Sequence, residues 1–171
     1  MTNDLPAIDA LVPHAPPMRW LRRFLAHAGD ETECEACADD LTLLHDSRGA
    51  VPGYAALELA AQCVSAHARL VAREGGTPRI GFLLGARRFA VHAASLAPGQ
   101  LLRVRVKRLW GADAGPVSFD TEVRDAASGA LLAGGRISCF TPAASEARSE
   151  AESSEPSEDR TVASVRETDS E

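Results

Sequence analysis

Residues 54–76 read YAALELAAQCVSAHARLVAREGG, and this stretch decides the fold of the chain. The turn sequence VPG at 51–53 precedes it and the glycine pair at 75–76 closes it, a pattern that predicts a helix of roughly twenty residues. Its apolar side chains do not keep to one stripe, and many of them are alanines. A helix that is apolar on most sides is buried on most sides, so we expect one long central helix.

The segments on either side of this helix have the pattern of β-strands. Before it, MRWLRRFLAH and ETECEACA are two strand-like runs joined by a turn at 27–30. After it come four more runs, IGFLLGARRFAVHA, QLLRVRVKRLW, VSFDTEVRD and ALLAGGRISCF, with a hairpin turn at 126–129 between the last two. Residues 102–109 alternate between apolar and basic side chains, which indicates a strand with one buried face. We predict an α+β fold in which a curved antiparallel sheet wraps around one helix, the hotdog architecture. The exposed edges of such a sheet are commonly extended by dimerisation.

The charge of the chain is unevenly placed. It has 18 basic and 24 acidic residues, a net charge of -6, and residues 143–171 alone contain nine acids and three arginines. That segment has almost no large apolar side chain, so we expect a disordered acidic tail at 143–171 after a hotdog domain at 1–142. The rest of the chain is neutral and has no basic stripe, which argues against nucleic-acid binding.

The sequence also bears on location and redox chemistry. No secretory segment is visible, and the most apolar stretch, 54–72, carries charged residues, so we expect a cytoplasmic protein without a membrane span. The four cysteines are then expected to be reduced thiols. Cys34 and Cys37 form a CxxC pattern on a predicted strand, where residues three apart point to opposite faces. We therefore expect neither a metal site nor a cofactor.

Glu58 is a carboxylate inside the most apolar part of the predicted helix. A carboxylate there is costly unless it has partners, and a carboxylic acid in apolar surroundings is suited to general acid catalysis. Gln62 lies four residues further along the same helix face and could orient it. The alternative is that Glu58 reaches a solvent-facing gap or pairs with an arginine such as Arg87 or Arg88.

The start of the helix and two loop histidines are further candidates. Gly53 and Tyr54 stand where the backbone can pass close to a ligand, and the first-turn N–H groups carry partial positive charge. A thioester carbonyl placed there would gain oxyanion stabilisation, although an ordinary turn has the same sequence. His14 and His45 lie on predicted loops, and either could serve as a base near neutral pH. His67, inside the helix, is expected to be a core residue.

Three segments resemble the 3-hydroxyacyl-acyl-carrier-protein dehydratases. LVPHAPPMRWLRRFL at 11–25 is similar to the opening "LPH-x-x-P-hydrophobic" strand of that family. VPGYAALELAAQ at 51–62 resembles its "MPG…E…AQ" helix start, and ARRFAVHAASLAPGQL at 86–101 resembles its "ARF…V.PGD.L" segment. The phrase GFLLGARR at 81–88 resembles the branch of dehydratase-like proteins that belongs to aryl polyene biosynthesis.

The resemblance implies a hotdog fold and a dehydration reaction. In that family water is removed from a 3-hydroxyacyl thioester on an acyl carrier protein, which leaves a trans-2-enoyl thioester. A histidine takes the C2 proton and a carboxylate on the central helix protonates the departing hydroxyl. The two side chains come from different subunits of a homodimer. By this match Glu58 is the carboxylate, and Gln62 is the glutamine that follows it. Gly53 belongs to the turn that forms the oxyanion site, and Tyr54 comes directly after that turn.

The chain departs from the family at the catalytic histidine. The family carries "HFPG" with its histidine fourteen residues before the carboxylate, and Leu44 holds that position here. His45 is offset by one residue, so the base would come from either His14 or His45. The departure leaves two other functions open. One is a hotdog thioesterase whose helix carboxylate activates water, and the other is a non-catalytic partner subunit in a heterodimer with another hotdog protein.

An acyl carrier protein, the partner that the resemblance implies, is acidic. We therefore expect a basic docking rim, unless the alternating arginines simply form one solvated face of the sheet. The candidates are Arg87, Arg88, Arg103, Arg105, Lys107 and Arg108.

Overall fold

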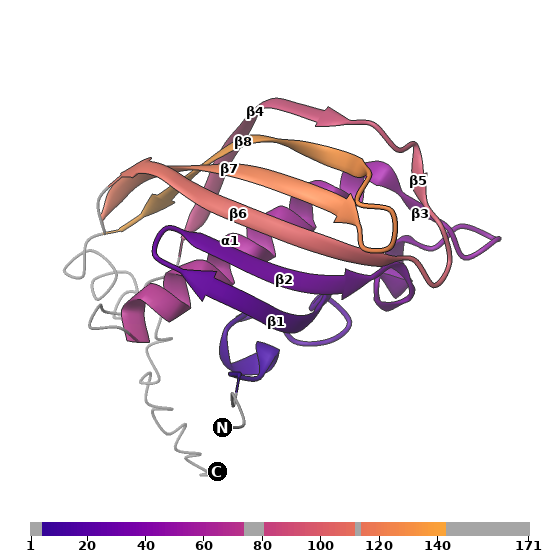
Figure 1. Cartoon of the computed structure of the whole chain (residues 1–171), viewed down its shortest axis with the longest axis horizontal. Helices are drawn as coiled ribbons and strands as arrows, with labels where there is room; N and C mark the ends of the chain where they lie inside the picture. Colours follow the sequence, from indigo (N-terminus) through magenta and orange to yellow (C-terminus); the bar gives the residue numbers. More distant parts are fainter. Residues whose placement is uncertain (1–4, 74–80, 112–113, 143–171) are drawn as a thin grey trace, which may run out of the picture.

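A curved six-stranded antiparallel sheet wraps around one long helix, α1 (Ala56–Arg73), as Figure 1 shows. The computed structural model describes residues 5–73, 81–111 and 114–142. The strand order in the sheet is β1-β2-β6-β7-β8-β4. The bounds are β1 (Leu21–Ala28), β2 (Glu31–Cys37), β4 (Phe82–Val91), β6 (Leu101–Gly111), β7 (Gly115–Asp125) and β8 (Leu131–Thr141). The predicted α+β architecture is confirmed, with its two predicted strands before the helix and four after it.

Short elements connect the sheet to the helix. A two-residue ladder pairs β3 (Val51–Pro52) with β5 (Ser95–Leu96), and it fixes the chain just before the helix begins. The 3-10 helix η4 (Gly53–Ala55) leads directly into α1. Three further 3-10 turns lie upstream, η1 (Ile8–Ala10), η2 (Ala38–Asp40) and η3 (Thr42–Leu44). The glycine pair predicted to end the helix, at 75–76, lies outside the described residues.

The helix is buried on most of its surface, as its composition predicts. Between Ala56 and Ala72 only Ala68 and Arg69 are exposed. Leu59, Ala60 and Cys63 are fully buried against the concave face of the sheet. The small alanines let this face come close to the strands, so that helix and sheet share one core.

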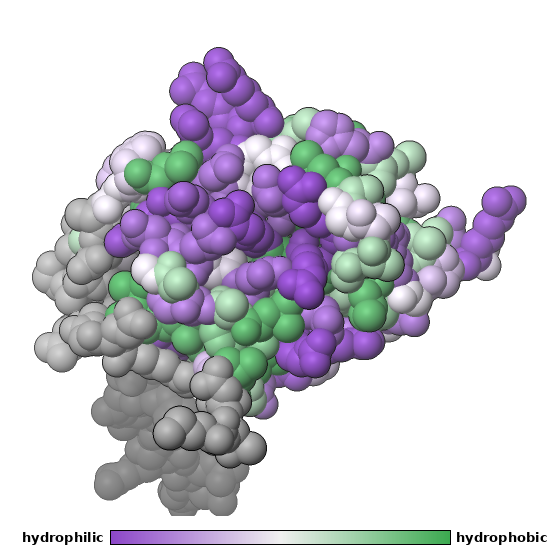
Figure 2. Space-filling view, in the orientation of Figure 1, coloured by the Kyte–Doolittle hydropathy of each residue, from purple (hydrophilic) through white to green (hydrophobic). Residues whose placement is uncertain are grey.

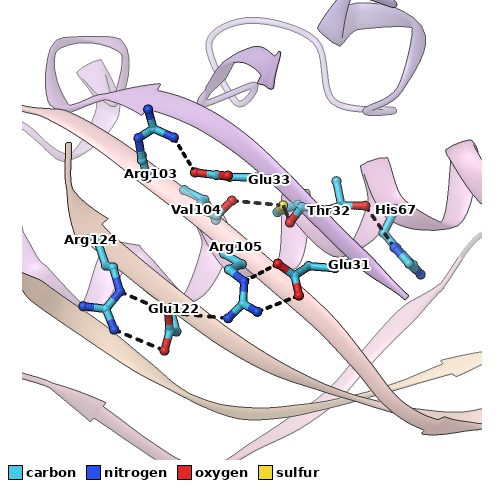
Figure 3. A network of polar contacts seen from close by, with 10 residues as sticks. Glu31, Thr32, Glu33, His67, Arg103, Val104, Arg105, Glu122 and Arg124 are labelled. Atoms are coloured by element: carbon cyan, nitrogen blue, oxygen red, sulfur yellow. Dashed lines mark hydrogen bonds and ion pairs between the residues drawn. The ribbon is translucent and has the colours of Figure 1, made fainter. Parts of the chain in front are cut away.

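The alternation in β6 sorts its side chains between the two faces of the sheet. Leu102, Val104 and Val106 are fully buried on the inner face. Outside, Arg103 donates to Glu33 at 2.7 Å and Arg105 donates to Glu31 at 2.6 Å, a network seen in Figure 3. Hydrophilic residues dominate the middle of this face in Figure 2. Arg103, Arg105 and Arg108, three members of the predicted basic rim, therefore belong to ion pairs with this chain's own carboxylates.

Strand β4 forms one edge of the sheet and pairs only with β8 within the described residues. Its side chains are exposed except at Phe89. The exposed apolar residues on it are Phe82, Leu83, Leu84 and Val91. An open edge with apolar side chains invites another strand to pair with it.

Other sequence-based expectations concern cysteines, membranes and the tail. All four cysteines are buried free thiols, Cys34 and Cys37 among them. In the part of the chain that the structure describes, no three His, Cys, Asp or Glu side chains gather closely enough to hold a metal ion. None of the described helices is long and apolar enough to cross a membrane. The proposed acidic tail at 143–171 lies outside the described residues, so the domain boundary stays a prediction.

Candidate active site

Glu58 lies in the first turn of α1. Its side chain is 35% exposed, so it is neither deeply buried nor free in solvent. Gln62 donates a hydrogen bond from Nε2 to Glu58 Oε1 at 3.0 Å. Among the described residues no arginine forms an ion pair with Glu58, and its nearest cationic candidate is a histidine. The carboxylate is therefore held at the rim of the core and remains available to a ligand.

Gln62 connects this carboxylate to the segment that enters β1. The side chain is fully buried, and its Oε1 accepts a hydrogen bond from the Trp20 backbone N–H at 2.9 Å. Its Nε2 also donates to the Met18 carbonyl oxygen at 2.8 Å. A buried amide that satisfies its donors and acceptor in this way has one orientation. The amide thus fixes both the Glu58 carboxylate and the entry segment.

His14 lies on that entry segment and faces Glu58. Its Nε2 is 3.8 Å from Glu58 Oε1. Its Nδ1 is buried and has no hydrogen-bond partner among the described residues. The side chain as a whole is 35% exposed. The structure thus brings a histidine and a carboxylate of the same chain to one place, although they are far apart in the sequence.

The two side chains open onto a pocket of about 860 Å³ that runs along α1. The helix contributes one wall through Glu58, Ala61, Ser65 and Ala68, which share one face. The entry segment, β7 and β8 supply the other walls, with Val117, Phe119 and Cys139 as apolar members. A long, mostly apolar hollow with a titratable pair at one end suits an acyl chain whose polar end reacts.

His45 does not line this pocket within one chain. Its Nε2 donates to the Ala38 carbonyl oxygen at 3.0 Å, and it is absent from the residues that line the pocket. His45 follows η3 directly, on the loop that leads to β3. Of the two histidines that the sequence offers as a base, the structure places His14 beside Glu58.

Gly53 and Tyr54 are placed differently from the pocket residues. The Gly53 N–H donates to the Ala94 carbonyl oxygen at 2.9 Å. A Cβ on Gly53 would lie 1.8 Å from the Ala93 carbonyl oxygen, so glycine is required here by the crossing backbone. Tyr54 is 64% exposed and is absent from the pocket lining. Within one chain, therefore, the packing of the strand explains Gly53, and Tyr54 faces solvent.

His67 is a pocket-wall residue that sequence reasoning assigned only to the core. It is almost fully buried, and its Nδ1 forms a hydrogen bond with Thr32 Oγ1 at 3.0 Å, as Figure 3 shows. Thr32 also bonds His27 Nδ1 at 2.8 Å. Burial is the main cause that lowers the pKa of His67 to about 4, and the nearby positive charges of His27 and Arg108 act in the same direction. His67 is thus neutral near pH 7. In the sequence His67 lies inside a largely apolar predicted helix, which gave no signal for this pocket position.

Comparison with known structures identifies the class of fold as hotdog. The dehydratase heterocomplex ApeI:P from Xenorhabdus doucetiae matches with a TM-score of 0.75 and 22% identity, over 85% of this chain and 97% of that chain. Conserved protein PA5202 from Pseudomonas aeruginosa matches with a TM-score of 0.59 and 17% identity, over 80% and 99% of the two chains. Zebra fish thioesterase superfamily member 2 matches with a TM-score of 0.52 and 17% identity, over 70% and 80%.

The family follows from the sequence itself. Residues 6–150 match the family described as ApeP-like, ApeP dehydratase. The chain therefore belongs to the ApeP-like dehydratases, the aryl polyene branch of the hotdog dehydratases. No curated protein matches the sequence.

Proposed function

We propose that the chain dehydrates 3-hydroxyacyl thioesters carried by an acyl carrier protein, in aryl polyene biosynthesis or a related cytoplasmic pathway. Membership of the ApeP-like dehydratases supports the reaction class. The single observation that carries the proposal is the pairing of His14 with Glu58, 3.8 Å apart, at one end of an apolar pocket. The reaction needs one base and one acid on adjacent carbons, and this pair supplies both.

In the proposed reaction His14 Nε2 removes the proton from C2, and protonated Glu58 donates its proton to the hydroxyl on C3. The C3–O bond breaks, water leaves, and the electron pair of the former C2–H bond forms the double bond. His14 is then cationic and Glu58 anionic, and a proton passed between them restores both groups. Gln62 keeps the Glu58 carboxyl oriented through its hydrogen bond to Oε1. Both groups belong to one chain in this scheme.

A second candidate function is that of a partner subunit in a heterodimeric dehydratase. Two observations favour it, the open edge of β4 and the similarity to a solved heterocomplex of dehydratases. In that case the pocket along α1 would complete a site whose reactive groups lie on another hotdog chain. The thioesterase alternative has weaker support, because it rests on structural similarity alone.

The decisive experiment replaces Glu58 by Gln in the purified full-length chain. A synthetic 3-hydroxyacyl group on an acyl carrier protein is the substrate, and enoyl formation is followed by absorbance and mass spectrometry. We expect turnover to fall by about 100-fold or more, as for the loss of a general acid. The matched control is Glu33→Gln, the same chemical change at a carboxylate that pairs with Arg103 on the outer face of the sheet and does not line the pocket, and it should retain most of the activity.

Three other results separate the alternatives. Turnover that is unchanged in Glu58→Gln removes Glu58 from the mechanism. Activity that requires an added hotdog subunit and survives the Glu58 substitution supports the partner role. Release of free thiol without enoyl product indicates a thioesterase.

A further inference from the structure

Three arginines gather on the outer face of the sheet. Arg87 on β4 lies directly opposite Arg136 on β8, so two cations are neighbours across the strands. A register shift in β4 adds Arg88 beside them. All three line one hollow of about 520 Å³, the arginine hollow, which Asp120 and Gly135 also line. Like charges that face each other on neighbouring strands destabilise their pairing, so this arrangement favours a bound anion.

The described part of the chain does not neutralise these arginines. No ion pair within 4.0 Å joins Arg87, Arg88 or Arg136 to a carboxylate of the described residues. Asp120 lies opposite both Arg136 and Lys107, so it is one acid shared between two strands of cations. The arginine hollow therefore has excess positive charge.

The acids that the hollow lacks are abundant in the sequence that follows β8. Residues 143–171 contain nine acids and three arginines, and the run SEAESSEPSED at 149–159 has five acids and no base. Runs of like charge at the end of a chain often act as interaction segments. Because Arg136 lies on β8, the strand that leads to this segment, the arginine hollow is a cationic surface close to it along the chain.

The length of the chain permits the contact. Strand β8 ends at Thr141, and at about 3.3 Å per residue its end lies about 17 Å from Arg136. Residues 142–150 can span about 30 Å when extended, so the first acids of the run can return to the hollow. A ligand tethered in this way acts at an effective concentration on the order of 1 mM, so a pairing that is weak between separate molecules becomes substantial within one chain.

We propose that the acidic run at 149–159 folds back onto the arginine hollow of its own chain, neutralises it and closes it to other acidic macromolecules. The inference is independent of the proposed dehydration and of Glu58. An acidic carrier protein is the less favoured occupant. Asp120 and Arg136 lie on the outer face, whereas Phe119 and Cys139 line the Glu58 pocket on the inner face. A carrier bound at the hollow would sit across the sheet from the reactive groups.

Zero-length cross-linking of the full-length chain locates the acidic run. A carbodiimide joins a lysine amine to a carboxylate that it touches, so the variant is Arg136→Lys. We expect a cross-link between position 136 and the run at 149–159, with a yield that falls about threefold or more between about 0.05 M and 0.5 M salt. The matched control is Arg48→Lys on an exposed loop, which should give about one tenth of that yield or less. If Arg136→Lys does not fold, as judged by circular dichroism, Arg87→Lys takes its place.

Competition shows whether the run occupies the hollow. The probe is a fluorescent decaglutamate peptide, and its binding to the full-length chain is followed by anisotropy at low salt. A variant in which the five acids of the run are replaced by their amides should bind the probe about tenfold more tightly than the wild type. Adding Arg87→Gln/Arg136→Gln to this variant should remove the gain. Adding Arg48→Gln/Arg69→Gln instead, two exposed arginines away from the hollow, should preserve it.

Three results overturn the proposal. Equal cross-linking of Arg136→Lys and Arg48→Lys would show that the run has no preferred site. Cross-links between chains, detected in a mixture of isotope-labelled and unlabelled protein, would assign the run to a second copy. A neutralised run without any gain in probe binding would show that the hollow is open in the wild-type chain.

Discussion

At the scale of single residues, Gln62 has the most consequential position in the molecule. It is a fully buried amide with hydrogen bonds to Trp20, Met18 and Glu58, so it joins the helix to the entry segment that carries His14. The distance between His14 and Glu58 therefore depends on a residue that itself has no acid–base chemistry. Removing the amide should loosen the pair and leave buried polar groups unsatisfied.

We expect Gln62→Leu to lower the free energy of unfolding by about 2–4 kcal/mol, because the buried Trp20 N–H and the part-buried Met18 carbonyl lose their hydrogen-bond partner. Urea denaturation followed by fluorescence measures the change. Ser65→Ala is the matched control, since its hydroxyl makes one long bond of 3.4 Å to the Ala61 carbonyl, and it should cost less than about 0.5 kcal/mol. Equal effects of the two substitutions would contradict the role assigned to Gln62.

His67 makes stability depend on pH in a defined window. Its pKa in the folded chain is lowered from 6.5 to about 4, so below pH 6.5 the unfolded chain takes up a proton that the folded chain does not. The stability that the neutral imidazole contributes is complete above pH 6.5 and is lost as the pH falls towards 4. By pH 5 we expect a loss of about 2 kcal/mol in the free energy of unfolding.

Urea unfolding at a series of pH values checks this prediction. His67→Gln should remove most of the slope between pH 6.5 and 5, whereas substitution of the exposed His92 by Gln should leave the slope as it is. The carboxylates of Glu31 and Glu122 have lowered pKa values, because Arg105 and Arg124 donate hydrogen bonds to them. The contribution of these carboxylates to stability is lost only at lower pH. The change in the free energy of unfolding between pH 6.5 and 5 is therefore assigned to His67. An unchanged slope in His67→Gln would refute the assignment.

At the scale of elements, the β3–β5 ladder sets where the helix begins. Gly53 follows β3 directly, and its Cα faces the Ala93 carbonyl oxygen so closely that no side chain fits. Any atom added there must push the two backbone segments apart, which would displace the first turn of α1 and Glu58 with it.

Gly53→Ala should therefore lower the free energy of unfolding by about 2 kcal/mol or more. The control is Gly85→Ala on β4, because a Cβ at Gly85 meets nothing within 4 Å. That substitution should change stability by less than about 0.5 kcal/mol. Thermal melting by calorimetry distinguishes the two. A Gly53→Ala chain as stable as the control would show that the backbones separate without cost.

Periodicity in the sequence predicts the long elements well. The alternating run at 102–109 and the apolar stretch at 54–76 are long enough for packing to impose one period. The first lies within β6, and the second contains α1 (Ala56–Arg73), whose predicted end at 75–76 lies outside the described residues. The β3–β5 ladder has two residues on each side, too few to show any period. Strand β4 has a register shift at Arg88, whose φ of 53° is in the left-handed region. This feature escapes prediction because the Arg88 carbonyl fits only against a residue without a Cβ, Gly135, which is distant in sequence.

The candidate site was only partly visible in the sequence. Glu58 and Gln62 share a helix face, so their contact follows from helical spacing alone. The proximity of His14 to Glu58 comes from the path of an irregular segment, which no local pattern encodes. The position of His45 outside the pocket also depends on the path of a loop. The pocket position of Phe119 depends on the order of the strands in the sheet, which the sequence left open.

At the scale of the whole molecule, the two sheet edges are not equivalent. Strand β1 is the other edge, and there Arg22 and Arg23 form ion pairs with Asp40 and Glu35 of this chain. Strand β4 instead combines exposed apolar side chains with arginines that lack acidic partners among the described residues. The two edges thus differ in chemistry, with paired charges at β1 and exposed apolar side chains at β4.

Three of the residues with which α1 lines the pocket, Ala61, Ser65 and Ala68, have small side chains. A methyl or propyl group added to any of them would shorten the hollow from one side, while the strands behind would keep their present positions. The length of ligand that fits can therefore change through a single substitution on this helix face, with little loss of folding stability.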